Sequence, residues 1–321
     1  MQRRTTMGLT PDSFQSVRFN QPQRIMSADR LMQLAAEVGA AGAHGGMTDI
    51  TFDWARRTRQ LKEELDMYLE IQTFLPRPDA DEFEHAVKVA KEAGATSLRV
   101  VCLLGRRYEL MATLDDWKRA VAGFHQQIEA ALPIVERHKM PLGIENHKDW
   151  RVDEQVALLR QYDSEFLGVS LDTGNNLTVL DDPMEVVEKL APFTFNVHLK
   201  DMAALENERG YLLSEVPLGE GMLDIKGMVA AVRRARPGVY FSLEMITRDP
   251  LEVPCLDEKY WATFDDVNGV HLARLLRLIR AHKPASLPRI SGLTPEERYA
   301  LELDFVERSI DYACRELGLA V

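Results

Sequence analysis

Cysteine is scarce in this sequence of 321 residues. Only Cys102, Cys255 and Cys314 are present, and they lie far apart along the chain. An odd number at this spacing provides neither a disulfide framework nor the CxxC pairs of a zinc-binding knuckle. This usage is typical of a reducing compartment, so we expect a cytoplasmic protein.

Long apolar runs are missing as well, and acidic residues outnumber basic ones. No window approaches the roughly 18 consecutive apolar residues of a membrane-spanning helix, and no apolar secretion signal follows the twin arginine at Arg3 and Arg4. The formal net charge is −11, and no block of lysine and arginine could follow a phosphate backbone. We therefore expect neither a membrane nor a nucleic acid among the partners.

A glycine-rich phosphate loop is the third absence, and it bears on the fold. Short apolar strand-like runs alternate with amphipathic helical stretches, which indicates βα units and a parallel sheet. An open doubly wound sheet would usually carry a glycine-rich loop after its first strand, and the segment GLTPDSF at 8–14 is not one. The alternation therefore favours an α/β fold of the (β/α)8 TIM barrel type over residues 1–283.

This prediction can be stated element by element. The expected strands lie near residues 5–9, 41–44, 69–73, 97–102, 141–145, 168–172, 195–199 and 239–244. The expected helices lie near residues 28–38, 54–67, 80–93, 115–138, 152–162, 183–190, 225–235 and 265–282.

Two segments lie outside the alternation. Residues 200–223 are rich in glycine, and we expect a long loop that forms a lid or rim. Residues 284–321 begin as a proline-spaced linker and continue as a helix that opens at Thr294, followed by proline and two acids. The apolar positions of that C-terminal helix need a partner surface, either the barrel or a neighbouring subunit.

Four consecutive late strands end in a side chain that can bind a metal ion: Glu145, Asp172, His198 and Glu244. In a TIM barrel the carboxyl ends of the strands meet at the face that carries the active site. Taken singly, an acid at a strand end is commonly a cap or an ion-pair partner, and a histidine is commonly a core residue. Together, three carboxylates in one pocket would repel one another unless a cation held them. The set therefore predicts one divalent metal ion.

The donor set indicates which ion and which chemistry to expect. Three carboxylates and one imidazole suit Mn2+ first, with Mg2+, Co2+ or Zn2+ as alternatives. On a six-coordinate ion two positions would remain for adjacent oxygens of a hydroxy-ketone. The ion would polarise the carbonyl and stabilise an enediolate, while a carboxylate moves the proton.

Four motifs resemble one family, the xylose isomerase-like TIM barrel superfamily, also described as the sugar phosphate isomerase/epimerase group. They are GIENHKDW at 143–150, SLDTGN at 170–175, NVHLKD at 196–201 and FSLEM at 241–245. The resemblance spans roughly residues 5–283 and implies that the four residues named above bind one divalent cation. It also implies that Glu145 and Glu244 form the acid/base pair on opposite sides of a carbohydrate substrate. A homo-oligomer, dimer or tetramer, is the expectation from the family.

The chain departs from the ketohexose 3-epimerases of this superfamily at three positions. Asn175 stands where they carry a histidine, Arg151 where they carry a second glutamate, and Ala204 where they carry an arginine. The four candidate metal ligands are thus retained, whereas the residues with which those epimerases bind their substrate are not. This pattern argues against a free ketohexose as the substrate.

Four residues are candidates for substrate contact: His147, Asn175, Lys200 and Arg248. Lys200 resembles the lysine of superfamily members that act on keto-cyclitols and oxidised sugars; the alternative is a rim lysine paired with Asp201. His147 could face the pocket or be structural, and Arg248 could reach substrate or form a rim ion pair. His44, which closes the second strand, is a weaker candidate of the same kind.

These residues bear on four possible functions. The first is a metal-dependent sugar isomerase or epimerase that transfers a proton through an enediolate. The second is a metal-dependent dehydratase or lyase that eliminates a β-leaving group from a keto-cyclitol or 3-keto-glycoside. A trinuclear zinc endonuclease would need a histidine at Asn175 and an Asp-x-His pair where the chain reads PLGEGMLD at 217–224. The intact metal set argues against a non-catalytic sugar-binding barrel.

Overall fold

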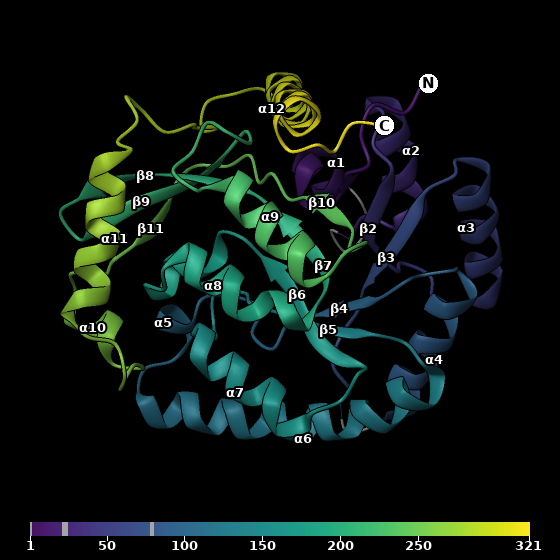
Figure 1. Cartoon of the computed structure of the whole chain (residues 1–321), viewed down its shortest axis with the longest axis horizontal. Helices are drawn as coiled ribbons and strands as arrows, with labels where there is room; N and C mark the ends of the chain where they lie inside the picture. Colours follow the sequence, from purple (N-terminus) through teal and green to yellow (C-terminus); the bar gives the residue numbers. More distant parts are fainter. Residues whose placement is uncertain (1, 21–24, 78–79) are drawn as a thin grey trace.

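A closed barrel of parallel strands forms the centre of the molecule, which confirms the predicted TIM barrel (Figure 1). The computed structural model describes residues 2–20, 25–77 and 80–321. The strands follow one another around the barrel in the order β1-β10-β7-β6-β5-β4-β3-β2. They are β1 Gly8–Leu9, β2 Gly42–Gly46, β3 Tyr68–Gln72, β4 Leu98–Val100, β5 Leu142–Glu145, β6 Leu167–Asp172, β7 Thr194–Leu199 and β10 Phe241–Leu243.

Helices surround the barrel, and four of them coincide end to end with the predicted ranges: α2 Ala28–Val38, α7 Val152–Tyr162, α8 Pro183–Leu190 and α9 Ile225–Ala235. Local chemistry explains this agreement. At the start of α8, for example, the Asp182 side chain accepts hydrogen bonds from the backbone N–H groups of Met184 and Glu185. The other helices are η1 Pro11–Phe14, α1 Gln15–Phe19, α3 Phe52–Glu64, α4 Ala80–Glu92, α5 Arg107–Leu110, α6 Leu114–His138, η3 Asn175–Val179, η4 Ala191–Phe193, α10 Glu258–Trp261, α11 Gly269–Ala281 and α12 Pro295–Glu316.

The segment after β7 is a β-hairpin, so the predicted loop at 200–223 was wrong. Strands β8 Asp201–Asn207 and β9 Gly210–Val216 pair antiparallel, and β11 Leu251–Val253 adds a third strand. Gly210, which favoured a loop in the prediction, lies at the hairpin turn with φ 148. In an antiparallel hairpin a turn glycine marks the end of a strand rather than the absence of one.

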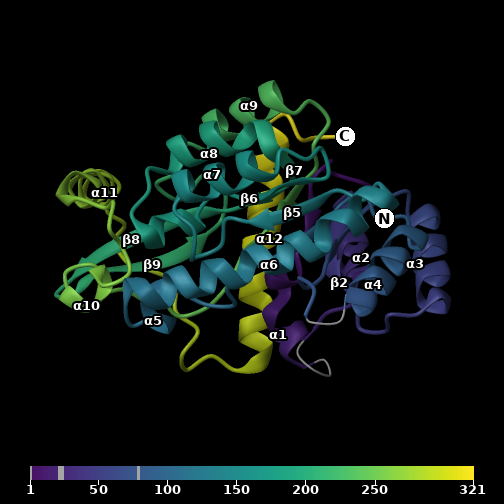
Figure 2. The same cartoon turned by 90° about the horizontal axis from the view of Figure 1, so that it is seen from below.

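The predicted eighth barrel helix at 265–282 exists as α11, but it packs elsewhere. It contacts β8, and the hairpin sheet lies between α11 and the barrel strands (Figures 1 and 2). Helix α12 packs between α9 and the N-terminal segment. The Arg233 Nη1 atom donates to the carbonyl of Leu317 at 2.8 Å, and Ser16 N donates to Glu302 Oε1 at 2.9 Å. The last helix therefore covers the flank of the barrel between α9 and α1.

Within the described ranges no helix combines the length and the apolar character that crossing a membrane requires.

The contact face of α12 gives a test of how much the barrel depends on it. Ile310 is fully buried on this helix, whereas Glu307 is exposed on the same helix. Ile310→Ala should lower the free energy of unfolding by about 3 kcal/mol, because it removes buried apolar contacts and leaves a cavity. Glu307→Ala is the matched control and should change it little. Urea denaturation followed by circular dichroism measures both, and equal stabilities would show that α12 is not part of the core.

Candidate metal centre

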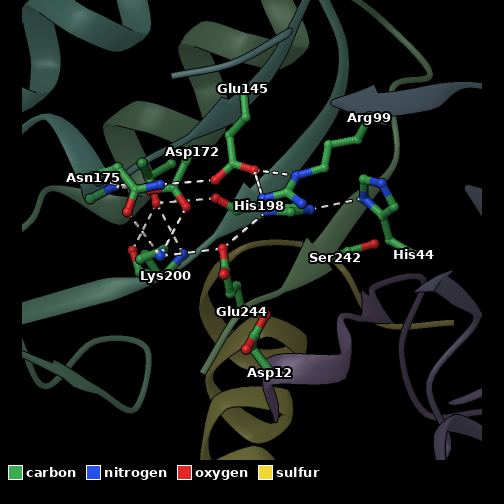
Figure 3. Close-up of polar contacts among 12 residues, drawn as sticks. Asp12, His44, Arg99, Glu145, Asp172, Asn175, His198, Lys200, Ser242 and Glu244 are labelled. Carbon is green, nitrogen blue, oxygen red and sulfur yellow. Dashed lines mark hydrogen bonds and ion pairs between the residues drawn. The ribbon is translucent and has the colours of Figure 1, made fainter. Parts of the chain in front are cut away.

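The carboxyl ends of four neighbouring strands bring Glu145, Asp172, His198 and Glu244 together (Figure 3). One candidate ligand atom from each residue lies within 4.8 Å of the others, and all four side chains are buried. The strand register explains the convergence, since Asp172 is paired with His198 and Glu244 follows the Leu199–Leu243 pair. In Figure 3, Glu145 and Glu244 point toward His198 from opposite sides.

Asp172 is held so that one oxygen faces the cluster. Its Oδ1 accepts hydrogen bonds from the backbone N–H groups of Gly174 at 2.8 Å and Asn175 at 2.7 Å. A side chain at Gly174 would place its Cβ 2.7 Å from Met202 Cγ and 3.0 Å from Lys200 Cδ. The φ of Gly174 is −123, an ordinary value. Glycine is therefore needed here for the close approach of neighbouring side chains and not for a sharp turn.

His198 is oriented by a second buried histidine. Its Nε2 lies 2.9 Å from Nδ1 of His44, and its Nδ1 lies 3.0 Å from Glu244 Oε2. Burial and the neighbouring His198 hold the pKa of His44 well below its ordinary value, so His44 is neutral. A neutral His44 can accept the Nε2–H of His198, and this contact leaves the Nδ1 atom of His198 facing the carboxylates. The weaker candidate His44 is thus brought next to the cluster.

Lys200 lies inside the cluster and not on the rim. Its Nζ is 2.9 Å from Asp172 Oδ2 and 3.2 Å from Glu244 Oε2, and the side chain is 1% exposed. Burial would lower the pKa of Lys200, but the two carboxylates outweigh it and raise that pKa. The alternative partner Asp201 instead accepts backbone hydrogen bonds from Gly219, Gly221 and Leu223. The rim pairing with Asp201 is therefore not formed.

Arg99 on β4 also reaches the centre, and the sequence reasoning missed it. Its guanidinium pairs with Glu145 Oε2 through Nε and Nη2. Burial would raise the pKa of Glu145, yet Arg99 and His198 keep it below the ordinary value. A signal was available, because Arg99 interrupts the apolar strand at Leu98 and Val100, and strand alternation places it on the opposite face from them.

Asn175 links the carboxylates to a second lysine that the sequence reasoning missed. Its Nδ2 donates to Glu145 Oε1 at 2.9 Å, and its Oδ1 accepts from Lys148 Nζ at 2.7 Å. Lys148 is buried, and burial together with the charge of Lys200 lowers its pKa to about 8. The sequence gave no indication of the role of Lys148 other than its position in the loop after Glu145.

His147 and Arg248 lie beside this group. The Nδ1 of His147 is 3.1 Å from the carbonyl of Leu103, so Nδ1 carries the proton and Nε2 is left as an acceptor. Burial lowers the pKa of His147 to about 3, which makes the ring neutral. Arg248 Nη2 donates to Glu215 Oε1 at 2.9 Å, the ion pair that was the alternative to substrate contact. A role for either residue toward substrate stays a prediction.

The donor set fits a divalent cation, although the repulsion argument for one is weaker than the sequence suggested. Arg99 and Lys200 already place two positive charges among the three carboxylates. Asp172 Oδ2 and Glu244 Oε2 contact the ammonium of Lys200, and Glu244 Oε2 also contacts His198 Nδ1. These two oxygens and this nitrogen, buried and close together, are donors of the kind that a hard or borderline cation would use.

Comparison with known proteins gives one family and two partial relatives. A family model described as xylose isomerase-like TIM barrel matches residues 32–263. The 3-oxo-isoapionate decarboxylase of Pectobacterium atrosepticum is 32% identical over 108 residues, which cover 33% of this chain and 39% of that protein. The uncharacterized protein YihM of Escherichia coli is 24% identical over 219 residues, 64% of this chain and 62% of that protein. The aligned region is thus less than two thirds of either relative.

A solved structure of D-psicose 3-epimerase, determined in the presence of D-fructose, superimposes with a TM-score of 0.58. The match covers 91% of this chain and 94% of that one at 13% identity. At this level of sequence identity the match supports the fold alone and gives no information about the substrate of this protein.

The position of Lys200 predicts how the centre responds to a cation. Lys200→Met removes a positive charge beside Asp172 and Glu244, so Mn2+ should bind about tenfold more tightly, equal to about 1.4 kcal/mol. Isothermal titration of metal-free protein with MnCl2 measures the affinity. Lys118→Met, which removes an exposed lysine, is the control and should match the unsubstituted protein. Weaker binding in Lys200→Met would show that the lysine does not compete with the ion.

Proposed function

The chain belongs to the xylose isomerase-like TIM barrel family, and from this premise we propose a divalent-metal-dependent sugar isomerase or epimerase that works by enediolate proton transfer. The substrate would be a keto-sugar or a sugar derivative. The observation that carries the proposal is the convergence of Glu145, Asp172, His198 and Glu244 on one buried point. The cysteine usage and the family support a cytoplasmic homo-oligomer, dimer or tetramer.

Glu145, Asp172, His198 and Glu244 would hold the metal ion, and the oxygen-rich set favours Mn2+ over Mg2+, Co2+ or Zn2+. When bound, the ion supplies Lewis-acid chemistry, which polarises a substrate carbonyl and acidifies the neighbouring C–H bond.

Glu244 and Glu145 would exchange the substrate proton. Burial would raise the pKa of Glu244, but Lys200 and His198 hold it well below its ordinary value, so the carboxylate is ionised and can accept a proton. Glu145 lies on the other side of His198, and Arg99 and Asn175 fix its direction. In this assignment Glu244 removes the proton from carbon. Glu145, which takes up a proton from solvent beforehand, returns that proton from the opposite side.

Elimination or decarboxylation is the second candidate, and Lys200 is the observation that favours it. An ammonium group between Asp172 and Glu244 can donate a proton to a departing oxygen or stabilise an enolate. In a β-elimination from a keto-cyclitol or 3-keto-glycoside, Glu244 would take the proton from the α-carbon. The leaving oxygen would depart with the electrons of the C–O bond and a proton from Lys200. The partial match to a decarboxylase supports this branch.

The acid/base assignment predicts the effect of removing either carboxylate. Glu145→Gln and Glu244→Gln should each lower kcat by roughly 10²–10⁴-fold, the usual contribution of a positioned acid or base. Thermal unfolding should show that both variants remain folded, and Glu208→Gln, at an exposed glutamate, is the control. Undiminished turnover in both active-site variants would refute the assignment.

The two candidate reactions predict different products from one substrate. Incubation of the Mn2+-loaded protein with a 3-keto-glucoside or an inosose in D2O should give a stereoisomer or positional isomer that carries one solvent deuterium. Mass spectrometry and NMR identify it. Loss of water or aglycone would instead assign a lyase, and recovery of unlabelled substrate from a range of such compounds would contradict both.

A further inference from the structure

Lys148 is a buried cation that makes no direct contact with a carboxylate in the described part of the chain. Its side chain lies in the loop after β5, and the residue is only 7% exposed. The Nζ atom donates to the neutral amide oxygen of Asn175 at 2.7 Å. Within the described residues no carboxylate oxygen lies within 4.0 Å of that nitrogen. An ammonium group has three N–H donors, and burying it without an anion is costly.

Every other cation around the centre has its own carboxylate. Arg99 pairs with Glu145, Lys200 pairs with Asp172 and Glu244, and Arg248 pairs with Glu215. Among the described residues of the site, Lys148 is thus the cation that makes no direct contact with a carboxylate. A divalent ion on the four candidate ligands would add two further positive charges. The loaded centre would then hold an excess of positive charge, which an anionic group could neutralise.

Asn175 holds Lys148 close to the reacting region. Its Oδ1 accepts from Lys148 Nζ at 2.7 Å and lies 3.4 Å from Lys200 Nζ, while its Nδ2 donates to Glu145 Oε1. One amide therefore joins the unpaired ammonium to both the lysine and the carboxylate of the candidate centre. A ligand that bonds to Lys148 lies beside these groups.

We propose that the substrate of this site carries a carboxylate, and that Lys148 binds that carboxylate while the adjoining carbons meet the metal centre. The enzyme then prefers a sugar acid to the corresponding neutral sugar. The hydrogen bond to Asn175 Oδ1 keeps the Lys148 ammonium beside the place that this ligand would occupy. This proposal rests on the proposed function, since it names the substrate class of the same site.

The absence of an acidic partner separates this role from a structural one. A lysine that stabilised the fold through an ion pair would lower stability when removed. Because Lys148 has no such pair, the neutral isostere in Lys148→Met should unfold at the same temperature as the unsubstituted protein or at a higher one. A large loss of thermal stability would assign Lys148 to the fold and overturn the proposal.

Binding of a sugar acid tests the proposal without any need for turnover. Metal-free protein is titrated calorimetrically with D-gluconate, with the neutral polyol D-glucitol and with D-glucose 6-phosphate. Metal-free protein is used because gluconate can bind the ion directly. Gluconate should bind at least tenfold more tightly than glucitol, Lys148→Met should abolish that difference, and Lys148→Arg should retain part of it. Lys118→Met is the control and should keep the full preference.

Other results of the same titrations would overturn the proposal. Equal affinity for gluconate and glucitol, or unchanged gluconate affinity in Lys148→Met, overturns the carboxylate assignment. Tighter binding of the phosphate ester than of gluconate, lost in Lys148→Met, replaces it with a phosphorylated substrate. Failure of the catalytic assignment looks different, because Glu145→Gln and Glu244→Gln would then stay active while the binding preference set by Lys148 persists.

Discussion

The ammonium of Lys200, shared by Asp172 and Glu244, ties together the ends of three neighbouring strands. Burying one cation against two carboxylates is favourable only when the geometry is closely defined, and several local features meet that demand. Gly174 leaves room for the lysine stem, and the backbone amides after Asp172 hold that carboxylate in place. The next residue, Asp201, accepts hydrogen bonds from the backbone of Gly219 and Gly221. The hairpin that begins at Asp201 is therefore fixed directly beside Lys200.

Charge balance sets the chemistry that this arrangement supports. Arg99 and Lys200 neutralise much of the carboxylate charge, so the candidate ligands can lie close together with or without an ion. An ion that binds there competes with a permanent internal cation. The affinity of the site for the ion therefore depends on how much more favourably the carboxylates interact with the ion than with the ammonium of Lys200. Lys148 makes no direct contact with a carboxylate, and a divalent ion in the centre would add to its positive charge, which would favour an anionic ligand.

The sequence predicted those parts of the site that depend on strand periodicity and strand order. Each candidate ligand closes an apolar run, and parallel closure of the barrel then brings the four together, so the cluster could be derived before any coordinates. Arg99 was missed although its position between Leu98 and Val100 placed it on the opposite face of the strand from them. Lys148 was missed because its role depends on which side chains lie opposite it, and no local pattern indicates this. The hairpin at β8 and β9 was missed because Gly210 was interpreted as part of a long loop, although it lies at the turn between the two strands. The position of α11 depends on the hairpin sheet, which had not been predicted.

The barrel closes with the first and last parts of the chain. Strand β1 pairs with β10 and also with β2, and Thr5 forms a bridge with Ala320 beyond α12. During synthesis on a ribosome, β1 and β2 emerge early, but the partner that closes their open edge emerges more than 200 residues later. The nascent chain must therefore keep an unpaired strand edge soluble for most of its translation. Contacts of such long sequence separation are slow to form, and unpaired edges aggregate. Folding in the cell would thus be most vulnerable before β10 emerges from the ribosome.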